Sequence, residues 1–345
     1  MPPEPAGAKV LRSDSSDSRQ AKSPATQDAL EIILPGFLTT VQDRGRYGYQ
    51  RFGVPVSGAM DDFALRAANI LAGNDEGAAG LEISVLGPRI RVLYDTWIAV
   101  TGADLSPTID GETIPRWETV RVSKGSVLSF AGVRDGMRAY LAIAGGIDVP
   151  LVMSSRSTYL KGAIGGYEGR ALRAGDVLEA LSPKPGSRRV ERRFPRDHIP
   201  SYGHEHNLRV IMGSQDHYFN DGGISTFLSS RYVVSDQSDR TGYILEGPAI
   251  QHKSGPDIVS DGSPLGAIQV PGDGRPIILL ADRGTTGGYA KIGTVISSDI
   301  SKLAQAMPGD AVTFKKVTVE EAYSILRRQE SLLKSVAQTG IGGNL

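Results

Sequence analysis

Four glycine-rich segments carry most of the polar side chains that could do chemistry. The first runs from Thr39 to Asp62 and holds candidates for ligand binding and proton transfer, namely Gln42, Asp43, Arg46, Ser57 and Asp61. Glycine lets backbone N–H groups approach a ligand closely, so a loop of this composition suits recognition of an anion or a carbonyl group. The alternative is an elaborate hairpin whose charges pair internally.

The second segment, Gly145 to Gly169, places Arg156 between Ser155 and Ser157. A guanidinium flanked by hydroxyl groups can hold a carboxylate or a phosphate through several hydrogen bonds. A simple turn with a surface arginine is the alternative.

The third and fourth segments, Ser235–Pro248 and Ser260–Leu303, hold the remaining polar candidates: Asp239, Arg240, Gln269, Asp282, Thr286 and Tyr289. Asp282 directly follows an apolar run, Ile277 to Ala281, that is typical of a buried strand. Loops held by a rigid strand commonly carry functional groups. A glycine-rich hairpin without a ligand is again the alternative.

Several classes of chemistry are excluded by what the chain lacks. It has no cysteine, which excludes disulfides, thiolate metal sites and cysteine nucleophiles and favours a reducing, cytoplasmic location. It also lacks the G-x-x-x-x-G-K-[ST] phosphate loop, the G-x-S-x-G elbow and the H-E-x-x-H zinc motif. His204 and His206 alternate in a way that could seat a metal, but in their linker context we expect no metal site.

Charge and hydropathy narrow the range of partners. The 345 residues include 38 basic and 38 acidic side chains, whereas nucleic-acid and anionic membrane surfaces demand a basic excess. The longest aliphatic runs are far shorter than the roughly 20 apolar residues of a membrane span. We therefore expect a soluble protein that handles small molecules and binds neither nucleic acid nor membrane.

The elements that must position these groups are mostly strands. Glycine accounts for 42 of 345 residues, well above the usual share of about 7%, and punctuates short β-branched runs. The predicted strands are Trp97–Thr101, Thr119–Val122, Ser126–Phe130, Arg138–Ile143, Leu208–Met212, Pro276–Leu280, Gly293–Ile296 and Ala311–Lys315. One internal helix is predicted, capped by Asp61 or Asp62 and ended by Gly73. No βαβ alternation is present, so β-barrels or sandwiches are favoured.

The domain organisation follows from shifts in composition. We expect a disordered tail over 1–29, a first domain over 30–182, a Pro- and Arg-rich linker over 183–207 and a second domain over 208–317. A C-terminal helix and tail occupy 318–345, and Thr318 with Glu321 predict a capping box at the start of the helix. The Gly-Asp pairs at 175–176 and 309–310 each precede a predicted strand, which indicates two similar β domains.

The four polar segments together resemble one known family. The stretches TVQDRGRYGYQRFGVPVSGAMD, GGIDVPLVMSSRSTYLKGAIGGYEGR, SDRTGYILEGP and SDGSPLGAIQVPGDGRPIILLADRGTTGGYAKIGTVISSDISKLAQAMPGD resemble the biotin-dependent carboxyltransferase family. That family includes allophanate hydrolase subunit 2, the antagonist subunit of the Kip system and the C subunit of 5-oxoprolinase. The resemblance covers about Leu30 to Lys315 in order.

The resemblance implies a mainly β fold with two cyclophilin-like β-barrel domains, a few short helices and a C-terminal helix. It implies a sister chain of the type found as the B subunit of 5-oxoprolinase or as allophanate hydrolase subunit 1. A third chain of the LamB/YcsF type, the A subunit, joins them in the prokaryotic 5-oxoprolinase. The implied reaction is ATP-dependent opening of 5-oxoproline to glutamate, with ATP used at the level of the complex.

Two other functions are compatible with the same resemblance. In the urea amidolyase branch, the modules move a carboxyl group to urea from carboxybiotin that is carried on a separate chain. The Kip resemblance instead implies a non-catalytic protein that binds a kinase-inhibitor subunit. The sequence motifs are shared by all three branches and do not choose among them.

The resemblance also implies roles for the candidates, because both reactions act on an amide and build up oxyanion charge. Arg46, Arg156 and Arg240 are expected to clamp a carboxylate or phosphate, and Ser57, Ser157, Thr286 and Tyr289 to bind substrate. Gln42 and Gln269 would orient a carbonyl group, and the four carboxylates Asp43, Asp61, Asp239 and Asp282 are the candidates for general base or orienting group.

This chain departs from the family pattern at two places. Thr241 stands where relatives typically have Met in S-D-R-M-G, and Gly213-Ser214-Gln215 stands where Gly-Pro-Gln is common. Neither change removes a charged candidate, but both could alter the fit of the substrate.

Overall fold

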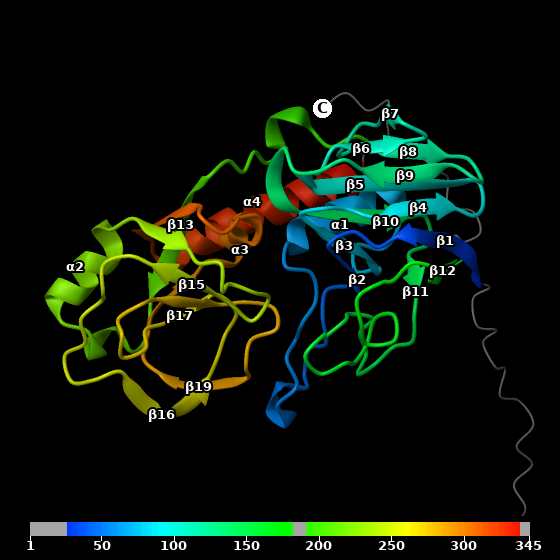
Figure 1. Cartoon of the computed structure of the whole chain (residues 1–345). Helices are drawn as coiled ribbons and strands as arrows, with labels where there is room; N and C mark the ends of the chain where they lie inside the picture. Colours follow the sequence, from blue (N-terminus) through cyan, green and yellow to red (C-terminus); the bar gives the residue numbers. More distant parts are fainter. Residues whose placement is uncertain (1–25, 182–190, 339–345) are drawn as a thin grey trace, which may run out of the picture.

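The computed structural model describes residues 26–181 and 191–338, which fold into two β domains that lie side by side (Figure 1). The expectations of disorder over 1–25 and of a solvated linker over 182–190 fall outside the described residues. The strand β1 begins at Thr26, four residues before the expected start of the first domain. Strands predominate over helices in the described residues, which confirms the predicted mainly β architecture.

The N-terminal domain is built from two packed sheets. Its strands are β1 (Thr26–Leu34), β2 (Leu38–Gln42), β3 (Gly80–Ser84), β4 (Arg89–Val92), β5 (Thr96–Asp104), β6 (Pro107–Ile109), β7 (Glu112–Thr113), β8 (Thr119–Val122), β9 (Val127–Phe130), β10 (Asp135–Ile143), β11 (Ile147–Asp148) and β12 (Val177–Leu181). One sheet has the order β11-β12-β1-β4-β9-β6-β7 and the other β2-β3-β10-β5-β8. The strands of this half thus divide between two sheets, where the resemblance predicted a second barrel.

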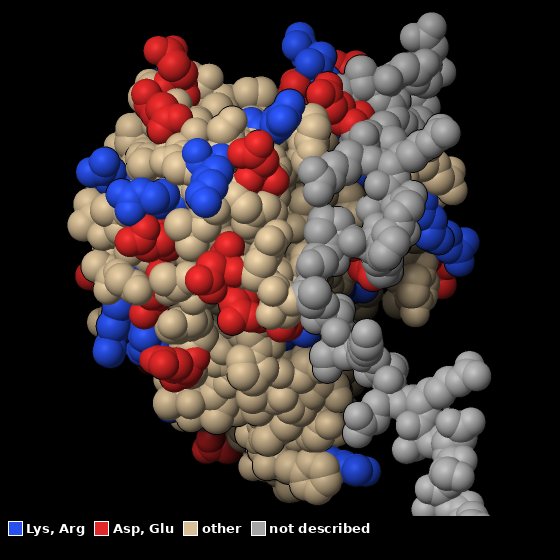
Figure 2. Space-filling model, turned by 90° about the vertical axis from the view of Figure 1, so that its right-hand side faces the viewer, with Lys and Arg blue, Asp and Glu red and all other residues tan. Residues whose placement is uncertain are grey.

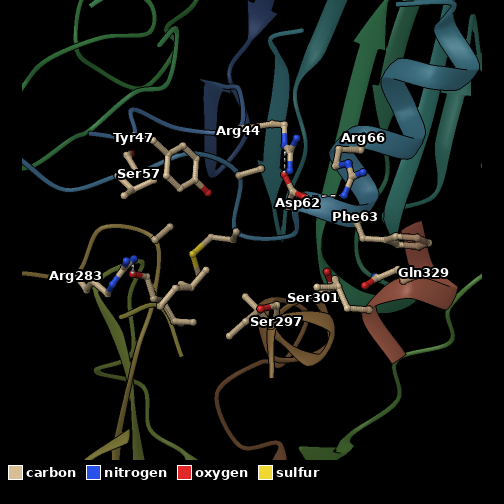
Figure 3. Close-up of a pocket in the computed structure, with 18 of the residues that line it drawn as sticks. Arg44, Tyr47, Ser57, Asp62, Phe63, Arg66, Arg283, Ser297, Ser301 and Gln329 are labelled. Atoms are coloured by element: carbon tan, nitrogen blue, oxygen red, sulfur yellow. Dashed lines mark hydrogen bonds and ion pairs between the residues drawn. The ribbon is translucent and has the colours of Figure 1, made fainter. Parts of the chain in front are cut away.

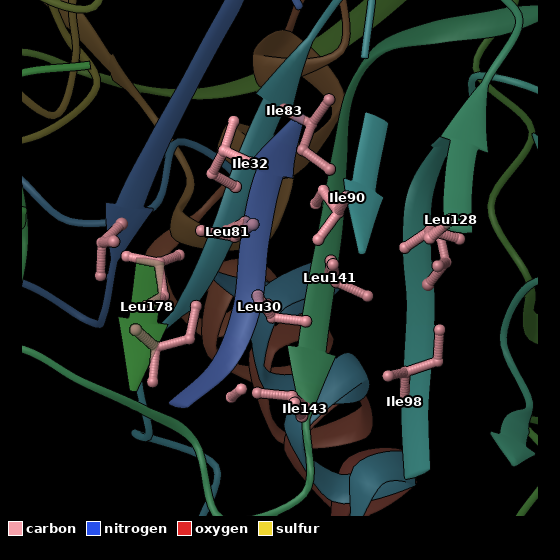
Figure 4. Packing of buried hydrophobic residues seen from close by; sticks show 14 of the residues in the cluster. Leu30, Ile32, Leu81, Ile83, Ile90, Ile98, Leu128, Leu141, Ile143 and Leu178 are labelled. Carbon is pink, nitrogen blue, oxygen red and sulfur yellow. The ribbon is translucent and has the colours of Figure 1, made fainter. Parts of the chain in front are cut away.

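The core of this domain lies between its two sheets, where branched aliphatic side chains interdigitate (Figure 4). The strand β10 shows why the pattern works, because successive side chains of a strand point to opposite faces. Leu141 and Ile143 face the inter-sheet core, whereas Tyr140 and Ala142 face a second cluster on the outside of the sheet. Both faces of β10 are buried over residues 139–143, and the sequence of this part is a continuous run without charged residues.

The C-terminal domain is a closed barrel with the strand order β13-β20-β17-β18-β15-β14-β21. Its strands are β13 (Glu205–Met212), β14 (Tyr232–Val234), β15 (Gly242–Glu246), β17 (Ala267–Gln269), β18 (Ile277–Leu279), β20 (Lys291–Val295) and β21 (Ala311–Lys316). A separate two-stranded sheet of β16 (Asp257–Gly262) and β19 (Thr286–Tyr289) lies beside the barrel (Figure 1). The barrel prediction is confirmed for this half of the chain.

Helices cover the outer faces and join the domains. They are α1 (Asp62–Ala72), α2 (Asp221–Ser229), α3 (Ser297–Ala304) and α4 (Val319–Gln338), with short 3-10 turns η1 (Gln50–Phe52), η2 (Arg196–His198) and η3 (Asp216–Tyr218). The helix α4 packs against both α1 and α3, so it spans the two domains (Figure 1). Met60, just before α1, is buried in the core of the C-terminal barrel.

Local sequence signals placed α1 and α4 correctly. The Asp61 side chain accepts a hydrogen bond from Ala64 N at 2.9 Å, and Gly73 ends α1 with a positive φ of 79°. At α4, Thr318 N donates to Glu321 Oε2 at 2.8 Å and Glu321 N donates to Thr318 Oγ1 at 3.2 Å, which confirms the capping box. The short helices α2 and α3 were not predicted, because they are glycine- or serine-rich and depend on packing against the barrel.

The two Gly-Asp turns have matching structures. Arg173 N donates to Asp176 Oδ2 at 2.7 Å, and Met307 N donates to Asp310 Oδ2 at 2.8 Å. A final strand follows each turn, β12 in the first domain and β21 in the second. This repeat confirms the predicted correspondence between the ends of the two domains.

The described part of the expected linker is packed on the N-terminal domain. The Phe194 side chain is fully buried, and its ring centroid lies 5.0 Å from that of Trp117 and 5.8 Å from that of Phe63. Tyr202 is also buried. Phe194 and Tyr202 therefore anchor residues 191–204 to the N-terminal domain, while most other side chains of this Pro- and Arg-rich segment are exposed or half-buried.

The surface carries both signs of charge. On the face shown in Figure 2, the described residues present basic and acidic side chains next to one another over its upper part. Across residues 26–181 and 191–338, no helix has the length and apolar character needed to cross a membrane.

We expect Phe194→Ala to lower the free energy of unfolding by about 3–5 kcal/mol, because it empties a fully buried aromatic site. The matched control is Phe37→Ala, whose side chain is 71% exposed and whose loss should change stability by less than about 0.5 kcal/mol. Urea unfolding followed by circular dichroism measures both. Equal stability of the two variants would show that residues 191–204 do not contribute to the core.

Candidate functional site

A cavity of about 330 Å³ lies between the two domains (Figure 3). The N-terminal domain contributes the segment from Arg44 to Arg66, and the C-terminal domain contributes Leu280 to Arg283 and residues of α3. The helix α4 closes one side. A volume of this size suits a ligand of small-molecule dimensions.

The loop that enters the cavity is held by Asp43, which follows β2. Its Oδ1 accepts hydrogen bonds from Gly45 N at 2.8 Å, from Ser155 Oγ at 2.7 Å and from the Ser157 hydroxyl. Its Oδ2 accepts from Arg156 N at 2.6 Å. Asp43 therefore ties the first polar segment to the second.

Ser57 is the predicted residue that faces the cavity. It has a positive φ of 58°, a conformation that is costly for a residue with a side chain. Its Oγ lies 2.8 Å from Asp282 Oδ1 and 2.9 Å from the Thr158 carbonyl oxygen. The single hydroxyl hydrogen can be donated to one of these acceptors, which leaves oxygen lone pairs free to accept a hydrogen bond from a ligand.

Beneath Ser57, three buried charged groups join the domains. Arg240 Nε donates to Asp282 Oδ2 at 2.9 Å, and its Nη1 donates to the Glu82 carboxylate of the other domain. Arg240 Nη2 also donates to the Gly58 carbonyl oxygen at 2.6 Å. Burial disfavours the charged guanidinium, but the two carboxylates outweigh that cost and raise the pKa of Arg240.

The same network continues to the start of α1. Tyr140 OH donates to Glu82 Oε2 at 2.7 Å and accepts from Asp61 N at 2.8 Å. Asp61 Oδ2 accepts from Gln305 Nε2 at 2.8 Å, a contact that again crosses the domain boundary. Burial raises the pKa of Asp61 to about 6.

Two neighbouring groups of the first segment are buried without full hydrogen bonding. The Arg46 side chain donates to the Ser157 carbonyl oxygen through Nη2, whereas its Nε and Nη1 have no hydrogen-bond partner among the described residues. Burial lowers the pKa of Arg46, and nearby Asp43 and Asp282 act in the opposite direction. Gln42 Oε1 is likewise buried and lacks a described hydrogen-bond partner.

The cationic group best placed to meet a ligand is Arg283. Its Nε donates to the Ser263 carbonyl oxygen at 2.7 Å and its Nη1 to that of Leu280 at 3.1 Å. No carboxylate of the described chain forms an ion pair with it, and burial lowers its pKa. By contrast, Arg44 and Arg66 on the opposite wall are each paired with Asp62 and Glu76. An anionic ligand would therefore find its free counter-charge at Arg283.

The structure brings seven of the predicted residues together between the domains: Gln42, Asp43, Arg46, Ser57, Ser157, Arg240 and Asp282. Most of them hold loops rather than face the cavity. Asp61 joins them through Tyr140 and Glu82, as the N-cap of α1.

The other five predicted residues lie elsewhere. Arg156 Nη2 pairs with Asp148 Oδ1 at 2.7 Å and lines a separate cavity of about 900 Å³ on the N-terminal domain. Asp239 forms an ion pair with Lys161 Nζ at 2.8 Å. Gln269 is buried in β17, and Thr286 and Tyr289 lie in β19 of the separate two-stranded sheet.

Sequence reasoning missed Glu82 and Gln305 and gave no role to Arg283. Arg283 stands directly after Asp282, in the polar loop that follows the apolar run Ile277 to Ala281 and that the sequence indicated as a candidate site. Glu82 stands between Leu81 and Ile83, and a carboxylate inside a buried strand signals a buried cation nearby. Gln305 gives no local signal, because its partners Asp61 and Arg138 are far away in the sequence.

The histidines considered for a metal contact an aspartate instead. His204 Nδ1 lies 2.7 Å from Asp310 Oδ1, and His206 Nε2 lies 3.2 Å from Asp310 Oδ2. Within residues 26–181 and 191–338, no three His, Cys, Asp or Glu side chains converge in the manner of a metal site.

Comparison with known proteins identifies similar chains of two kinds. The family model described as carboxyltransferase domain, subdomain A and B, matches residues 52–316. The 5-oxoprolinase C subunit of Escherichia coli is 37% identical over 313 residues, which cover 89% of this chain and 97% of that protein. The urea amidolyase of Saccharomyces cerevisiae is also 37% identical, over 90% of this chain but 18% of that protein.

Among solved structures, the K. lactis urea amidolyase matches with a TM-score of 0.84 and 32% sequence identity, over 91% of this chain and 20% of that chain. The chain thus spans about a fifth of the length of the urea amidolyases that it matches.

Replacing Arg240 by Met should lower the free energy of unfolding by about 3–5 kcal/mol, because Glu82 and Asp282 would stay buried without their cation. Chemical denaturation measures the loss. The control is Arg275→Met, which removes an exposed pair with Asp273 and should cost about 1 kcal/mol or less. Adding Glu82→Gln and Asp282→Asn should restore part of the loss; a triple variant as unstable as Arg240→Met would contradict this account.

The raised pKa of Asp61 predicts a pH dependence. Its value of about 6 in the folded state exceeds the ordinary value, so the folded protein binds the proton more tightly than the unfolded chain. This contribution to stability is present below pH 4 and is lost as the pH rises to 6 and above. Relative to Asp61→Asn, the wild type should lose about 2 kcal/mol of unfolding free energy between pH 4 and pH 7. Denaturation at each pH measures this, and parallel profiles would argue against a buried, titrating Asp61.

Proposed function

The chain belongs to the carboxyltransferase domain A and B family, and from that membership we propose that it is the C component of a 5-oxoprolinase-type enzyme complex. The observation that carries the proposal is the match to the Escherichia coli 5-oxoprolinase C subunit over 97% of that protein's length. The complex would open 5-oxoproline to glutamate with ATP. A sister chain of the B type and a third chain of the LamB/YcsF type would complete it in the cytoplasm.

The interdomain cavity supports this function through two groups of complementary chemistry. Substrate 5-oxoproline carries a carboxylate and a lactam amide. Arg283 offers a buried, unpaired positive charge to the carboxylate. Ser57 Oγ, whose hydrogen is held by Asp282 or the Thr158 carbonyl oxygen, can accept the lactam N–H.

The role of the surrounding network is to hold these two groups in place. Asp282 is fixed by Arg240, so Ser57 cannot rotate freely without losing its bond to Asp282. The apolar side chains of Met60, Phe63 and Leu280 line the rest of the cavity and exclude water from the bound amide. Groups that are fixed in advance hold a bound substrate in one orientation without further reorganisation. We assign no nucleotide contact to this chain.

A second candidate function is carboxyl transfer to urea. It is favoured by the equal identity to the Saccharomyces cerevisiae urea amidolyase and by the TM-score of 0.84 to the K. lactis protein. In that reaction carboxybiotin would be a substrate carried on another chain. The carboxybiotin would supply the activated carboxyl group. In this case Arg283 would meet the carboxyl group in transfer, because urea itself is neutral.

The test is an assay of glutamate from 5-oxoproline and ATP, with this chain and the partner subunits of its own organism, omitting each component in turn. Glutamate should disappear when this chain is left out. A parallel reaction with urea and a carboxybiotin donor tests the second candidate. Activity with urea and none with 5-oxoproline would transfer the proposal to urea carboxylation, and activity with neither, in a complex shown to assemble, would favour a non-catalytic binding role.

In the active complex, Arg283→Met should raise the KM for 5-oxoproline roughly 10- to 100-fold, the cost of losing a charged hydrogen bond. Arg275→Met, at an exposed site paired with Asp273, should leave KM unchanged. An unchanged KM in Arg283→Met would remove this arginine from the substrate site.

A further inference from the structure

A second cavity lies next to the interdomain cavity and shares two of its lining residues, Val56 and Arg283. Its volume is about 340 Å³. The rest of its wall comes from the loop around η1, from the end of β16 with the two residues after it, and from the residue before β19. These residues are Gln50, Pro55, Gly262, Ser263, Pro264 and Thr285. Of its wall, the proposed function uses Arg283 alone, on the side that faces the interdomain cavity.

The wall of this cavity presents a hydroxyl without a hydrogen-bond partner and a guanidinium without a carboxylate partner among the described residues. Ser263 is 7% exposed, and its Oγ has no hydrogen-bond partner among the described residues. Arg283 is also 7% exposed and has no carboxylate partner in the described chain. Buried polar groups are normally satisfied, so an unsatisfied hydroxyl beside a cation that lacks a counter-charge points to an anionic ligand.

Two more unsatisfied donors lie behind Ser263. Gln269 and Lys291 stand directly opposite each other on β17 and β20, so their side chains share one face. Both are buried, and neither Gln269 Nε2 nor Lys291 Nζ has a hydrogen-bond partner in the described structure. The acidic group that faces the ammonium is Asp261, whose Oδ2 lies 3.9 Å away on a side chain that is 63% exposed.

Gly287 shows that Gln269 and Ser263 lie close to each other. A Cβ atom at this position would lie 2.2 Å from Gln269 Nε2 and 3.2 Å from Ser263 Oγ. Both polar groups therefore approach the same point of β19. The cluster of Arg283, Ser263, Gln269 and Lys291 contains two positive charges and four donor groups.

The backbone around the cavity favours a carboxylate over a phosphate. Phosphate sites commonly use a run of free backbone N–H groups. Here Gly262 N donates to Asp261 Oδ1 at 2.7 Å, Ser263 N donates to the Thr285 carbonyl oxygen at 3.0 Å, and Pro264 has no N–H. The available donors are thus side chains, which suits a small planar anion.

We propose that the second cavity is a binding site for a small carboxylate or a carboxylate-like planar oxyanion, held by Arg283 and Ser263 and backed by Gln269 and Lys291. Bound there, the anion would lie next to a ligand of the interdomain cavity, with Arg283 between them. The inference goes beyond the proposed function, because the ligand class follows from the donors of this chain alone.

The test is titration of the purified full chain with ¹³C-labelled acetate, followed by the line width and shift of the acetate signal. Wild type should bind acetate, and Lys291→Met and Ser263→Ala should each weaken binding about tenfold or less, in that order of effect. Lys315→Met, at an exposed position of β21, is the matched control and should bind as wild type does.

Neither Ser263 nor Lys291 lines the interdomain cavity, so their effect separates the two sites. Thermal unfolding of each variant checks that it folds. If Lys291→Met does not fold, Ser263→Ala still decides the test. Three results would overturn the proposal: no acetate binding by wild type, binding of acetate by both variants as tight as by wild type, or tighter binding of inorganic phosphate than of acetate. Since no ATP or partner protein is present, failure here is distinct from failure of the proposed enzyme activity.

Discussion

The placement of Arg240 between Glu82 and Asp282 is the interaction on which the rest of the structure depends. One carboxylate comes from the five-stranded sheet of the first domain, and the other follows the barrel strand β18 of the second. A buried charge is tolerable only when it is paired and hydrogen-bonded, so the two domains must meet in one orientation to satisfy all three groups. The bond from Arg240 to the Gly58 carbonyl oxygen adds the loop that carries Ser57 to the same arrangement.

Most polar residues of the motifs serve this arrangement and do not face a ligand. Asp43 gathers the loops on either side of it through four hydrogen bonds, and Arg46 reaches the backbone of Ser157. Such residues are as distinctive in sequence as catalytic groups, because a buried polar side chain has few acceptable replacements. The groups that meet the cavities, Ser57 and Arg283, are fewer and are held in place by the others.

Chains similar to this one occur both as a protein of about this length and as part of much longer enzymes, and the fold of this chain matches the corresponding part of the K. lactis urea amidolyase. A fold by itself does not choose among substrates. The two candidate reactions differ in the charge of the small substrate, since 5-oxoproline carries a carboxylate and urea does not. The unpaired Arg283 between two cavities is therefore the feature of this chain with the most direct bearing on its substrate.

The sequence by itself determined the features that arise within a few residues: the cap and glycine stop of α1, the capping box of α4, the two Gly-Asp turns and the dominance of short strands. The resemblance added the family and the segments where polar groups gather. Only the tertiary structure decided which of those groups meet, because Glu82 and Arg240 are 158 positions apart and Asp61 and Gln305 are 244 apart. Contacts over such separations depend on how two sheets and a barrel pack, and no local propensity encodes that packing. For the same reason Arg156, Gln269, Thr286 and Tyr289 stood out in the sequence, yet the fold places them away from the interdomain cavity.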